Sequence, residues 1–363
     1  MAVRFFDNLR DYTEIKLRIL GRFLTPWSAK LGYQASKGGG VIWYVDGFAG
    51  PGQYKDGRDG SPLLALRRAN HINMEKRPYE LSCFFVEKDH NNWRNLSEIS
   101  EPFKRDGIKV RNERGEFSDF IVEIQEATKG STVLFFVDPF GISPLKYEKF
   151  RLLLGREWPI DLILTFPHRA VHRLATEHPH LVTEAIGSDT WKIGWDELAN
   201  PASQTERVLH ILRENVLTDG RFLDVVYYPI KPTKRSAPKY FLLFASRHYD
   251  AFELWNDEIA QEETTLSTNE YAQAPQTSFL PQVDQQITAN ILWDEVRDLL
   301  RAKRKTRRQD VIRFFVLSKW GQYHTRDIKK AVGAFIESGE VFREVRGKKS
   351  IDTDFLHYRG TSE

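Results

Sequence analysis

The sequence predicts an α/β fold in which helices cover both faces of a mostly parallel β-sheet. Three observations carry this prediction. Short apolar runs recur along roughly the first 250 residues, helical segments separate them, and the pattern becomes helical and basic near the C-terminal end. Continuous apolar runs are typical of strands buried on both faces, and their alternation with helices favours parallel strands.

Seven runs are expected to form the sheet. Five of them are candidates for parallel strands: residues 41–45, 81–86, 108–111, 132–137 and 161–166. The runs 223–228 and 239–245 are close enough in sequence to form an antiparallel pair at its end. A mostly parallel seven-stranded sheet with such a terminal antiparallel pair is the methyltransferase variant of the Rossmann-like fold.

The segments between these runs have helical signals. Apolar side chains from Tyr12 to Leu24 recur at three- and four-residue steps, which predicts a helix over 8–34 that kinks or restarts at Pro26. Ser61 and Pro62 predict a helix start, with Ser61 as the N-cap. Further helices are expected over 91–99, 118–127 and 145–154 and through most of 168–222.

The pattern predicts two domains. Residues 1–260 form the Rossmann-like domain, and 261–285, rich in Gln, Glu, Thr and Ser, is predicted to be a linker. Residues 286–363 contain three helical segments, near 287–302, 307–319 and 325–338, followed by a β-hairpin of 340–345 and 350–358. Three helices and a hairpin predict a C-terminal winged-helix domain.

Charge is distributed unevenly along the chain. Residues 286–363 hold 17 Lys and Arg against 11 Asp and Glu, whereas the rest holds 36 against 39. The excess predicts contact with nucleic acid, DNA or RNA, through phosphate-binding side chains; a solvated surface or a protein-binding winged helix are the alternatives. The candidate nucleic-acid-binding residues are Arg304, Lys305, Arg307, Arg308, Lys329, Lys330, Arg346, Lys348 and Lys349.

Composition excludes several classes of protein. The single cysteine, Cys83, excludes an internal disulfide framework and a zinc cluster built on thiolates, and no metal site is predicted. Charges interrupt every apolar run near the N-terminus, and no run approaches 18 apolar residues. We therefore expect no signal peptide, no membrane span and a cytoplasmic location.

The strongest functional signal is a glycine-rich loop directly after the first predicted strand. It reads D-G-F-A-G-P-G over residues 46–52. Ligands of open α/β sheets bind at the carboxyl ends of strands, and glycines let the backbone approach them closely. The loop lacks the third glycine of G-x-G-x-x-G and the G-K-[ST] of a P-loop. The candidate binding residues are Asp46, Phe48, Ala49, Gly50 and Gly52; a turn without a ligand is the alternative.

Acidic residues follow the next two strands. Glu87, with its neighbour Lys88, ends the second strand, where a carboxylate can accept both hydroxyls of a ribose. Glu116 and Phe117 follow the third strand, where they can meet an adenine amino group and cover its ring. With the glycine loop, these residues predict S-adenosylmethionine as the cofactor; a surface acid and an ordinary loop are the alternatives.

The fourth strand ends in V-D-P-F-G over residues 137–141. Asp138 can accept hydrogen bonds from an amino group that attacks a methyl sulfonium, Pro139 fixes the loop, and Phe140 can stack on a base. His168 follows the fifth strand and is a candidate for proton transfer. A structural Asp-Pro turn, and histidines that only cap or pack, are the alternatives.

The two loops resemble those of amino-directed nucleic-acid methyltransferases, which join D-x-F-x-G-x-G to [DNS]-P-P-[YFW]. Here the second loop is D-P-F-G, so the second proline is missing and the aromatic residue comes one position early. A cytosine-C5 mechanism needs a cysteine nucleophile, and Cys83 lies within a strand predicted to be buried. We therefore reject that mechanism.

A wider set of motifs resembles the three-Cys-motif partner protein family. They are D-G-F-A-G-P-G, G-S-P-L at 60–63, F-V-E-K at 85–88, V-D-P-F-G at 137–141 and Y-F-L-L-F-A-S-R-H at 240–248. The resemblance spans most of the chain and implies a methyltransferase-like fold. It also implies a partner similar to radical-SAM enzymes, which carries the family's three cysteines.

The leading hypothesis is an S-adenosylmethionine-dependent methyltransferase that acts on an exocyclic amino group of nucleic acid. The second is a cofactor-binding but non-catalytic partner of a radical-SAM-like protein, in DNA repair or defence against phage. The third is a small-molecule methyltransferase with a regulatory tail.

Overall fold

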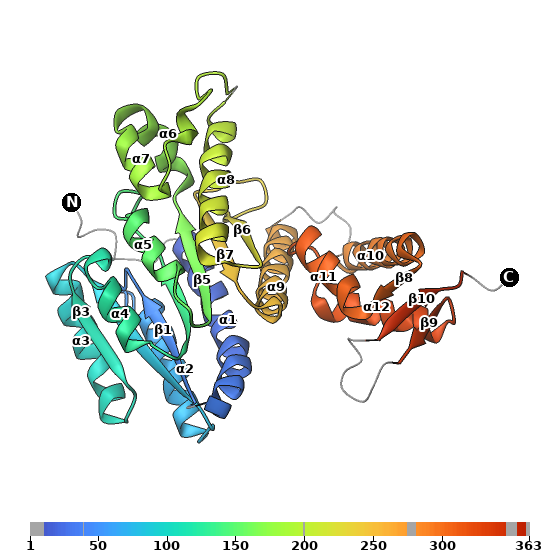
Figure 1. The fold of residues 1–363 in the computed structure, drawn as a ribbon, viewed down its shortest axis with the longest axis horizontal. Helices are drawn as coiled ribbons and strands as arrows, with labels where there is room; N and C mark the ends of the chain where they lie inside the picture. Colours follow the sequence, from blue (N-terminus) through green and yellow to red (C-terminus); the bar gives the residue numbers. More distant parts are fainter. Residues whose placement is uncertain (1–10, 39, 199, 274–280, 346–353, 361–363) are drawn as a thin grey trace. The chain divides into compact units, whose positions relative to one another are not determined.

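The computed structural model describes residues 11–38, 40–198, 200–273, 281–345 and 354–360 (Figure 1). The chain forms two compact units, Met1–Ala251 and Phe252–Glu363. Within the described residues, no helix combines the length and the apolar character needed to cross a bilayer.

Unit 1 contains the seven-stranded sheet that the sequence predicts. Its strands are β1 (Val41–Asp46), β2 (Glu80–Glu87), β3 (Val110–Arg114), β4 (Thr132–Val137), β5 (Ile160–Phe166), β6 (Asp224–Ile230) and β7 (Tyr240–Ser246). Their order is β3-β2-β1-β4-β5-β7-β6. The first five strands are parallel, and β7 pairs antiparallel with both β5 and β6. This is the class I methyltransferase arrangement, so the predicted fold class is confirmed for unit 1.

Helices lie on both faces of this sheet (Figure 1). They are α1 (Asp11–Ala35), α2 (Ser61–Met74), α3 (His90–Arg105), α4 (Ile121–Ala127), α5 (Tyr147–Leu154), α6 (His168–Glu177), α7 (Pro179–Ile186) and α8 (Pro201–Gly220), with short 3₁₀ turns η2 (Ser36–Gly38), η3 (Phe117–Asp119) and η4 (Thr190–Lys192). Alternate strand residues such as Val45 and Phe135 share one apolar core with residues of α4–α8. The opposite face contacts α1, where Phe23 packs on Phe244 at 5.4 Å between ring centroids.

Two expectations for the helices were wrong. Helix α1 does not restart at Pro26 but continues through it. The next residue anchors the helix, because Trp27 Nε1 donates to Asp161 Oδ2 at 2.7 Å in the buried interior. Helix α2 has Gly60 as its N-cap, and Ser61 is already within the helix. The hydroxyl of Ser61 instead donates to Asp46 Oδ2 at 2.6 Å. Trp27 and Ser61 thus form hydrogen bonds with residues far away in the sequence, which the local sequence pattern cannot predict.

Unit 2 contains the three helices predicted near 287–302, 307–319 and 325–338. They are α10 (Pro281–Lys303), α11 (Arg308–Ser318) and α12 (Thr325–Glu337). The strands β9 (Val341–Glu344) and β10 (Phe355–Tyr358) pair antiparallel, and an unpredicted short strand, β8 (Lys305–Arg307), pairs with β10. The sheet order is therefore β8-β10-β9.

The predicted linker, 261–285, is wrong at both of its ends: 281–285 begin α10, and 261–273 are helical as well. Helix α9 (Tyr249–Gln273) covers those residues, and its Glu262 and Leu266 are buried. Within unit 2, Asn256 donates to the Tyr323 carbonyl at 2.8 Å and accepts from the Gly321 N–H at 2.9 Å. A polar sequence therefore forms a packed helix, because its few apolar residues fall on one buried side. Residues 274–280 lie outside the described part of the chain.

The position of α9 also changes the charge of the C-terminal unit. Residues 252–363 contain the same 17 Lys and Arg as 286–363, but they contain 18 Asp and Glu instead of 11. The net charge of unit 2 is therefore about −1. Its basic residues therefore belong to a nearly neutral unit.

Candidate active site

The loop after β1 lies at the carboxyl edge of the sheet and is closed by its own backbone. Gly50 and Gly52 have φ angles of 65° and 80°, a conformation that favours glycine. The N–H of Gly60 donates to the Gly52 carbonyl at 2.8 Å, and a Cβ at Gly60 would lie 2.8 Å from the same oxygen. The loop therefore requires glycine where its two ends meet.

Asp46, the last residue of β1, anchors this loop by hydrogen bonds. It is fully buried and accepts hydrogen bonds from the Phe48 N–H at 3.0 Å, the Ser61 hydroxyl at 2.6 Å and the Tyr44 hydroxyl at 3.3 Å. Burial raises its pKa to about 7, although the bonds from Ser61 and Phe48 act in the opposite direction. Asp46 thus shapes the glycine loop and does not line the pocket described below.

Glu87 is adjacent to the glycine loop. Its Oε2 accepts from the Gly50 N–H and its Oε1 from the Asp89 N–H, both at 2.7 Å. Burial raises the pKa of this carboxyl group, and the two backbone hydrogen bonds oppose that shift. A carboxylate has about four acceptor positions, so Glu87 can accept further hydrogen bonds.

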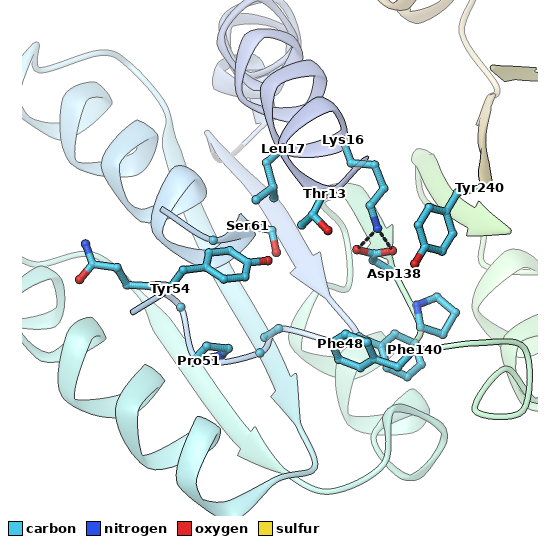
Figure 2. Close-up of a pocket in the computed structure, with 16 residues that line it drawn as sticks. Thr13, Lys16, Leu17, Phe48, Pro51, Tyr54, Ser61, Asp138, Phe140 and Tyr240 are labelled. Carbon is cyan, nitrogen blue, oxygen red and sulfur yellow. Dashed lines mark hydrogen bonds and ion pairs between the residues drawn. The ribbon is translucent and has the colours of Figure 1, made fainter. Parts of the chain in front are cut away.

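A pocket opens between this loop, the end of β4 and the first turns of α1 (Figure 2). Its empty volume is about 560 Å³, including space open to solvent. The loop contributes Phe48, Ala49, Gly50, Pro51, Gly52, Gln53, Tyr54, Gly60 and Ser61. The other lining residues are Thr13, Lys16, Leu17, Asp138, Pro139, Phe140 and Tyr240.

An ion pair between buried Lys16 and half-buried Asp138 crosses this pocket. Lys16 Nζ lies 2.6 Å from Asp138 Oδ1 and 2.7 Å from Oδ2, so one ammonium donates to both carboxylate oxygens. The same ammonium lies 4.6 Å from the ring centroid of Tyr240 (Figure 2). Lys16 and Tyr240 are functional candidates that sequence reasoning missed. Lys16 lies 122 residues from Asp138 in the sequence. The only feature of the sequence that could have indicated a buried Lys16 is its place in a predicted helix, next to the buried Ile15.

Aromatic residues form the apolar part of the pocket wall. Phe140 is 51% exposed, whereas the preceding Pro139 is buried. Phe48 is half-buried, and the ring of Tyr54 extends from the loop into the pocket (Figure 2). Burial of the Tyr54 hydroxyl raises its pKa well above the ordinary value. The wall thus offers flat apolar surface next to the Lys16–Asp138 pair.

Five of the predicted cofactor-binding residues do not line this pocket: Asp46, Glu87, Lys88, Glu116 and Phe117. Lys88 and Glu116 are exposed and pair with each other at 2.7 Å, which lowers the pKa of Glu116. Phe117 is 5% exposed and packs on Phe48, with ring centroids 5.7 Å apart. A Cβ at Gly47 would come within 2.8 Å of the Phe117 ring. The expectation that Phe117 covers a bound ring was wrong, because its side chain belongs to the core.

The predicted histidine cannot be placed. His168 begins α6, but its side chain lies outside the described part of the structure. Four residues later, His172 Nδ1 lies 2.7 Å from Gln204 Oε1, and Gln204 Nε2 donates to the Trp195 carbonyl at 3.2 Å. His172 therefore connects α6 to α8, and Gln204 extends the connection to Trp195, which precedes α8.

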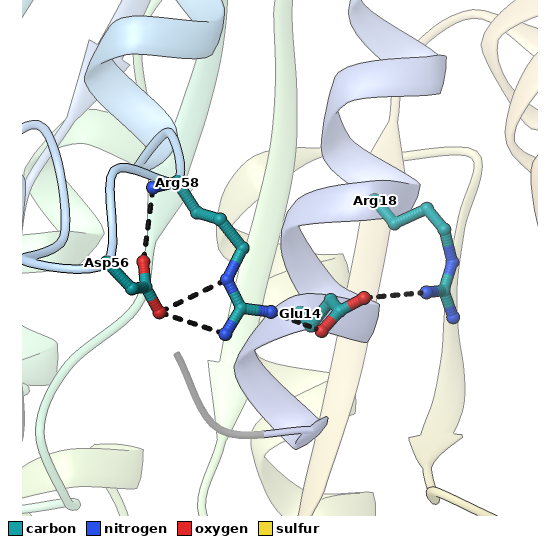
Figure 3. A network of polar contacts seen from close by, with 4 residues as sticks. All are labelled: Glu14, Arg18, Asp56 and Arg58. Atoms are coloured by element: carbon teal, nitrogen blue, oxygen red, sulfur yellow. Dashed lines mark hydrogen bonds and ion pairs between the residues drawn. The ribbon is translucent and has the colours of Figure 1, made fainter. Parts of the chain in front are cut away.

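Charged residues connect the segment after the glycine loop to α1 (Figure 3). Arg58 Nη1 lies 2.8 Å from Glu14 Oε2, and Arg58 Nη2 lies 2.9 Å from Asp56 Oδ2. Arg18 completes the network at 3.7 Å from Glu14. Because Glu14 is two residues from Lys16, the network joins the loop to the helix that supplies the buried ammonium.

Comparison with known proteins adds distant similarities of fold. No protein-family model matches the sequence, and no curated protein matches it either. Among solved structures, TYW2 of M. jannaschii in complex with AdoMet is 12% identical, over 62% of this chain and 74% of that chain, with a TM-score of 0.30. The fibrillarin/Nop5p complex is 14% identical, over 61% of this chain and 83% of that chain, with a TM-score of 0.30.

A third solved structure, the DszA carbon methyltransferase, is 16% identical over 57% of this chain and 46% of that chain, with a TM-score of 0.29. Identities and TM-scores this low carry no argument about activity. The class I methyltransferase fold of this chain rests on its own strand order.

The ion pair predicts non-additive effects of substitution. Asp138→Ala should lower the free energy of unfolding by about 3 kcal/mol, because it leaves the buried ammonium of Lys16 without its partner. Lys16→Met should lower it by less, because the Asp138 carboxylate that remains is 21% exposed. The double variant should lose clearly less than the sum of the two. Urea denaturation of the four proteins measures this coupling, and additive losses would contradict it.

The buried carboxyl group of Asp46 predicts a dependence of stability on pH. Its pKa is raised from 3.8 to about 7 in the folded protein. The folded state therefore holds the proton more tightly, and this contribution to stability, on the order of a few kcal/mol, is lost as the pH rises from about 4 to about 7. Relative to Asp46→Asn, the melting temperature of the wild type should fall between pH 5 and pH 8.

The matched variant Asp106→Asn removes an exposed carboxylate and should follow the wild type across this range. If the difference in melting temperature between the wild type and Asp46→Asn stays constant from pH 5 to pH 8, the assignment is wrong.

Proposed function

We propose that unit 1 binds S-adenosylmethionine and transfers its methyl group to an amino group of nucleic acid. One observation carries the proposal: the glycine turn at Gly50, the Glu87 carboxylate and the Asp138 carboxylate lie together at the carboxyl edge of β1, β2 and β4. In open α/β sheets this edge is where nucleotides bind.

The residues present fit an adenosyl ligand. Gly50 and Gly52 line the pocket without side chains of their own, and Glu87 has acceptor positions left for ribose hydroxyls. Glu116, paired with Lys88 at the surface, would accept from the adenine amino group. The cofactor would supply an electrophilic methyl group on its sulfonium.

Asp138 would receive the acceptor amine. Its carboxylate would accept an N–H of the amine, which orients the nitrogen lone pair toward the methyl group. The exposed ring of Phe140, with Phe48 beside the same pocket, would stack on the base and exclude water. Lys16 would hold the carboxylate in place until the amine replaces it as the hydrogen-bond donor to one of the two oxygens.

Unit 2 would hold the polymer as a winged helix. Its order of helices and strands, α10-β8-α11-α12-β9-β10, supports this proposal. Lys305 pairs with Glu344 at 3.1 Å and Lys329 with Glu253 at 3.0 Å, so their charges are partly compensated. The exposed Arg304, Arg307 and Lys330 are the stronger candidates for phosphate contacts. Arg346, Lys348 and Lys349 lie outside the described residues.

The ion pair also favours a second candidate function. Lys16 donates to both oxygens of Asp138, which are the atoms that an acceptor amine needs. With the D-P-F-G departure, this supports a cofactor-binding but non-catalytic partner. Its counterpart would be the radical-SAM-like protein implied by the resemblance to three-Cys-motif partner proteins.

Calorimetry and a transfer assay separate these two functions. The wild type should bind S-adenosylmethionine, and Glu87→Gln should weaken binding about tenfold or more, because it removes a charged acceptor of ribose hydroxyls. Asp138→Asn should retain binding, since the amide oxygen still accepts from Lys16, and should lose most methyl transfer to mixed nucleic acids.

Binding by the wild type without transfer to any nucleic acid would favour the partner function. Failure of the wild type to bind S-adenosylmethionine would contradict both proposed functions, the methyltransferase and the cofactor-binding partner. Melting temperatures of the variants serve as the control for folding.

The proposed role of unit 2 predicts salt-dependent binding of duplex DNA by the full chain. Substituting Arg304, Arg307 and Lys330 together by Gln should make the slope of log affinity against log salt shallower by about 3, because each lost phosphate contact removes about 0.9. The triple variant Lys104→Gln/Arg105→Gln/Lys129→Gln changes the charge equally in unit 1 and should leave the slope unchanged. Equal slopes for both variants would contradict the proposal.

A further inference from the structure

We propose that the β6–β7 connection, residues 231–239, is a phosphate-binding loop for a single-stranded nucleic acid whose base enters the pocket. This inference rests on the proposed function and names the surface of unit 1 that would hold the acceptor strand. The segment reads K-P-T-K-R-S-A-P-K, so it contains four basic residues and no acidic one.

The loop presents its charges on a closed turn. The N–H of Ser236 donates to the Thr233 carbonyl at 3.1 Å, and the two hydroxyls of these residues lie 2.7 Å apart. Lys234 and Arg235 therefore occupy the two central positions of a turn, and both are exposed. A turn closed in this way directs two adjacent cationic side chains outward.

The register of the sheet brings this loop to the pocket. Strand β7 runs antiparallel to β5, with Phe241 opposite Phe166, so β7 begins at the edge where β5 ends. Its first residue, Tyr240, is a pocket-lining residue. The loop is thus one residue away from the wall that also contains Lys16 and Asp138.

Cation–π contacts connect the loop to that wall. Lys239 Nζ lies 5.0 Å from the ring centroid of Tyr240 and 5.5 Å from that of Tyr12. Lys16 Nζ lies 4.6 Å from the Tyr240 ring, so this ring is close to two ammonium groups. The rings of Tyr12 and Tyr240 are themselves 6.4 Å apart and nearly perpendicular.

This combination favours a nucleic acid over other polyanions. Single strands are held by cations that follow the backbone and by aromatic rings that stack on bases. The loop supplies the cations, and Phe140, on the wall of the same pocket, supplies an exposed ring. An anionic lipid surface or an acidic protein would use the charges but would leave the aromatic pocket without a function.

The test uses the full chain and a fluorescent single-stranded oligonucleotide in a salt series. The variant Lys231→Gln/Lys234→Gln/Arg235→Gln should make the slope of log affinity against log salt shallower by about 2, since each phosphate contact to a single strand contributes about 0.7. The matched variant Lys104→Gln/Arg105→Gln/Lys129→Gln removes three cations at the opposite edge of the sheet and should retain the wild-type slope. Photo-crosslinking of a halogenated oligonucleotide should label a peptide that contains residues 231–240.

Three results would overturn the inference: equal slopes for the two variants, crosslinks confined to other peptides, or a loop variant that loses binding to anionic vesicles but not to the oligonucleotide. Calorimetry with S-adenosylmethionine keeps the two proposals separate. The loop variant should bind the cofactor like the wild type, whereas failure of the cofactor proposal would appear as absent binding in both proteins.

Discussion

Backbone N–H groups in a tight buried loop need acceptors, and two carboxylates meet this need after β1. Asp46 accepts from the Phe48 N–H, and Glu87, on the neighbouring strand, accepts from the Gly50 N–H. Unpaired, such groups would each cost about 1–3 kcal/mol in the interior. Asp46 and Glu87 therefore hold the glycine turn through its backbone N–H groups. These two acids determine the path of the loop, and the rest of the pocket is built around it.

The second constraint is the closure of this loop by α1. A helix that packs mainly through apolar residues supplies one buried ammonium, Lys16, to the pocket and one carboxylate, Glu14, to Arg58 of the segment after the glycine loop. Since Asp138 would be an isolated charge without Lys16, the helix and the end of β4 depend on each other electrostatically. The same contact limits the chemistry, because an acceptor amine has to compete with Lys16 for the carboxylate.

The fold was more predictable from the sequence than the site. Buried parallel strands such as β4 are continuous apolar runs, and their alternation with helices leads to the observed sheet. The glycine loop and Glu87 were predictable because each follows directly after a strand. Lys16 and Tyr240 were not, because their proximity to Asp138 depends on how α1 and β7 pack. Phe117 was misassigned for the same reason: its aromatic ring suits a ligand and a core equally well, and packing against Gly47 decides between them.

The error over α9 shows how a boundary affects an argument about function. A segment rich in Gln, Glu and Thr was assigned to a linker, although its Leu266 is buried and its Asn256 is bonded to Tyr323 and Gly321 within the same unit. Leaving its acids out made the C-terminal unit strongly basic, whereas the whole unit is close to neutral. Affinity for a polyanion then depends on where cations gather and on what lies beside them. By that criterion the β6–β7 loop is at least as strong a candidate for binding a polyanion as the exposed cations of unit 2. The residue that follows the loop, Tyr240, is aromatic and lines the pocket.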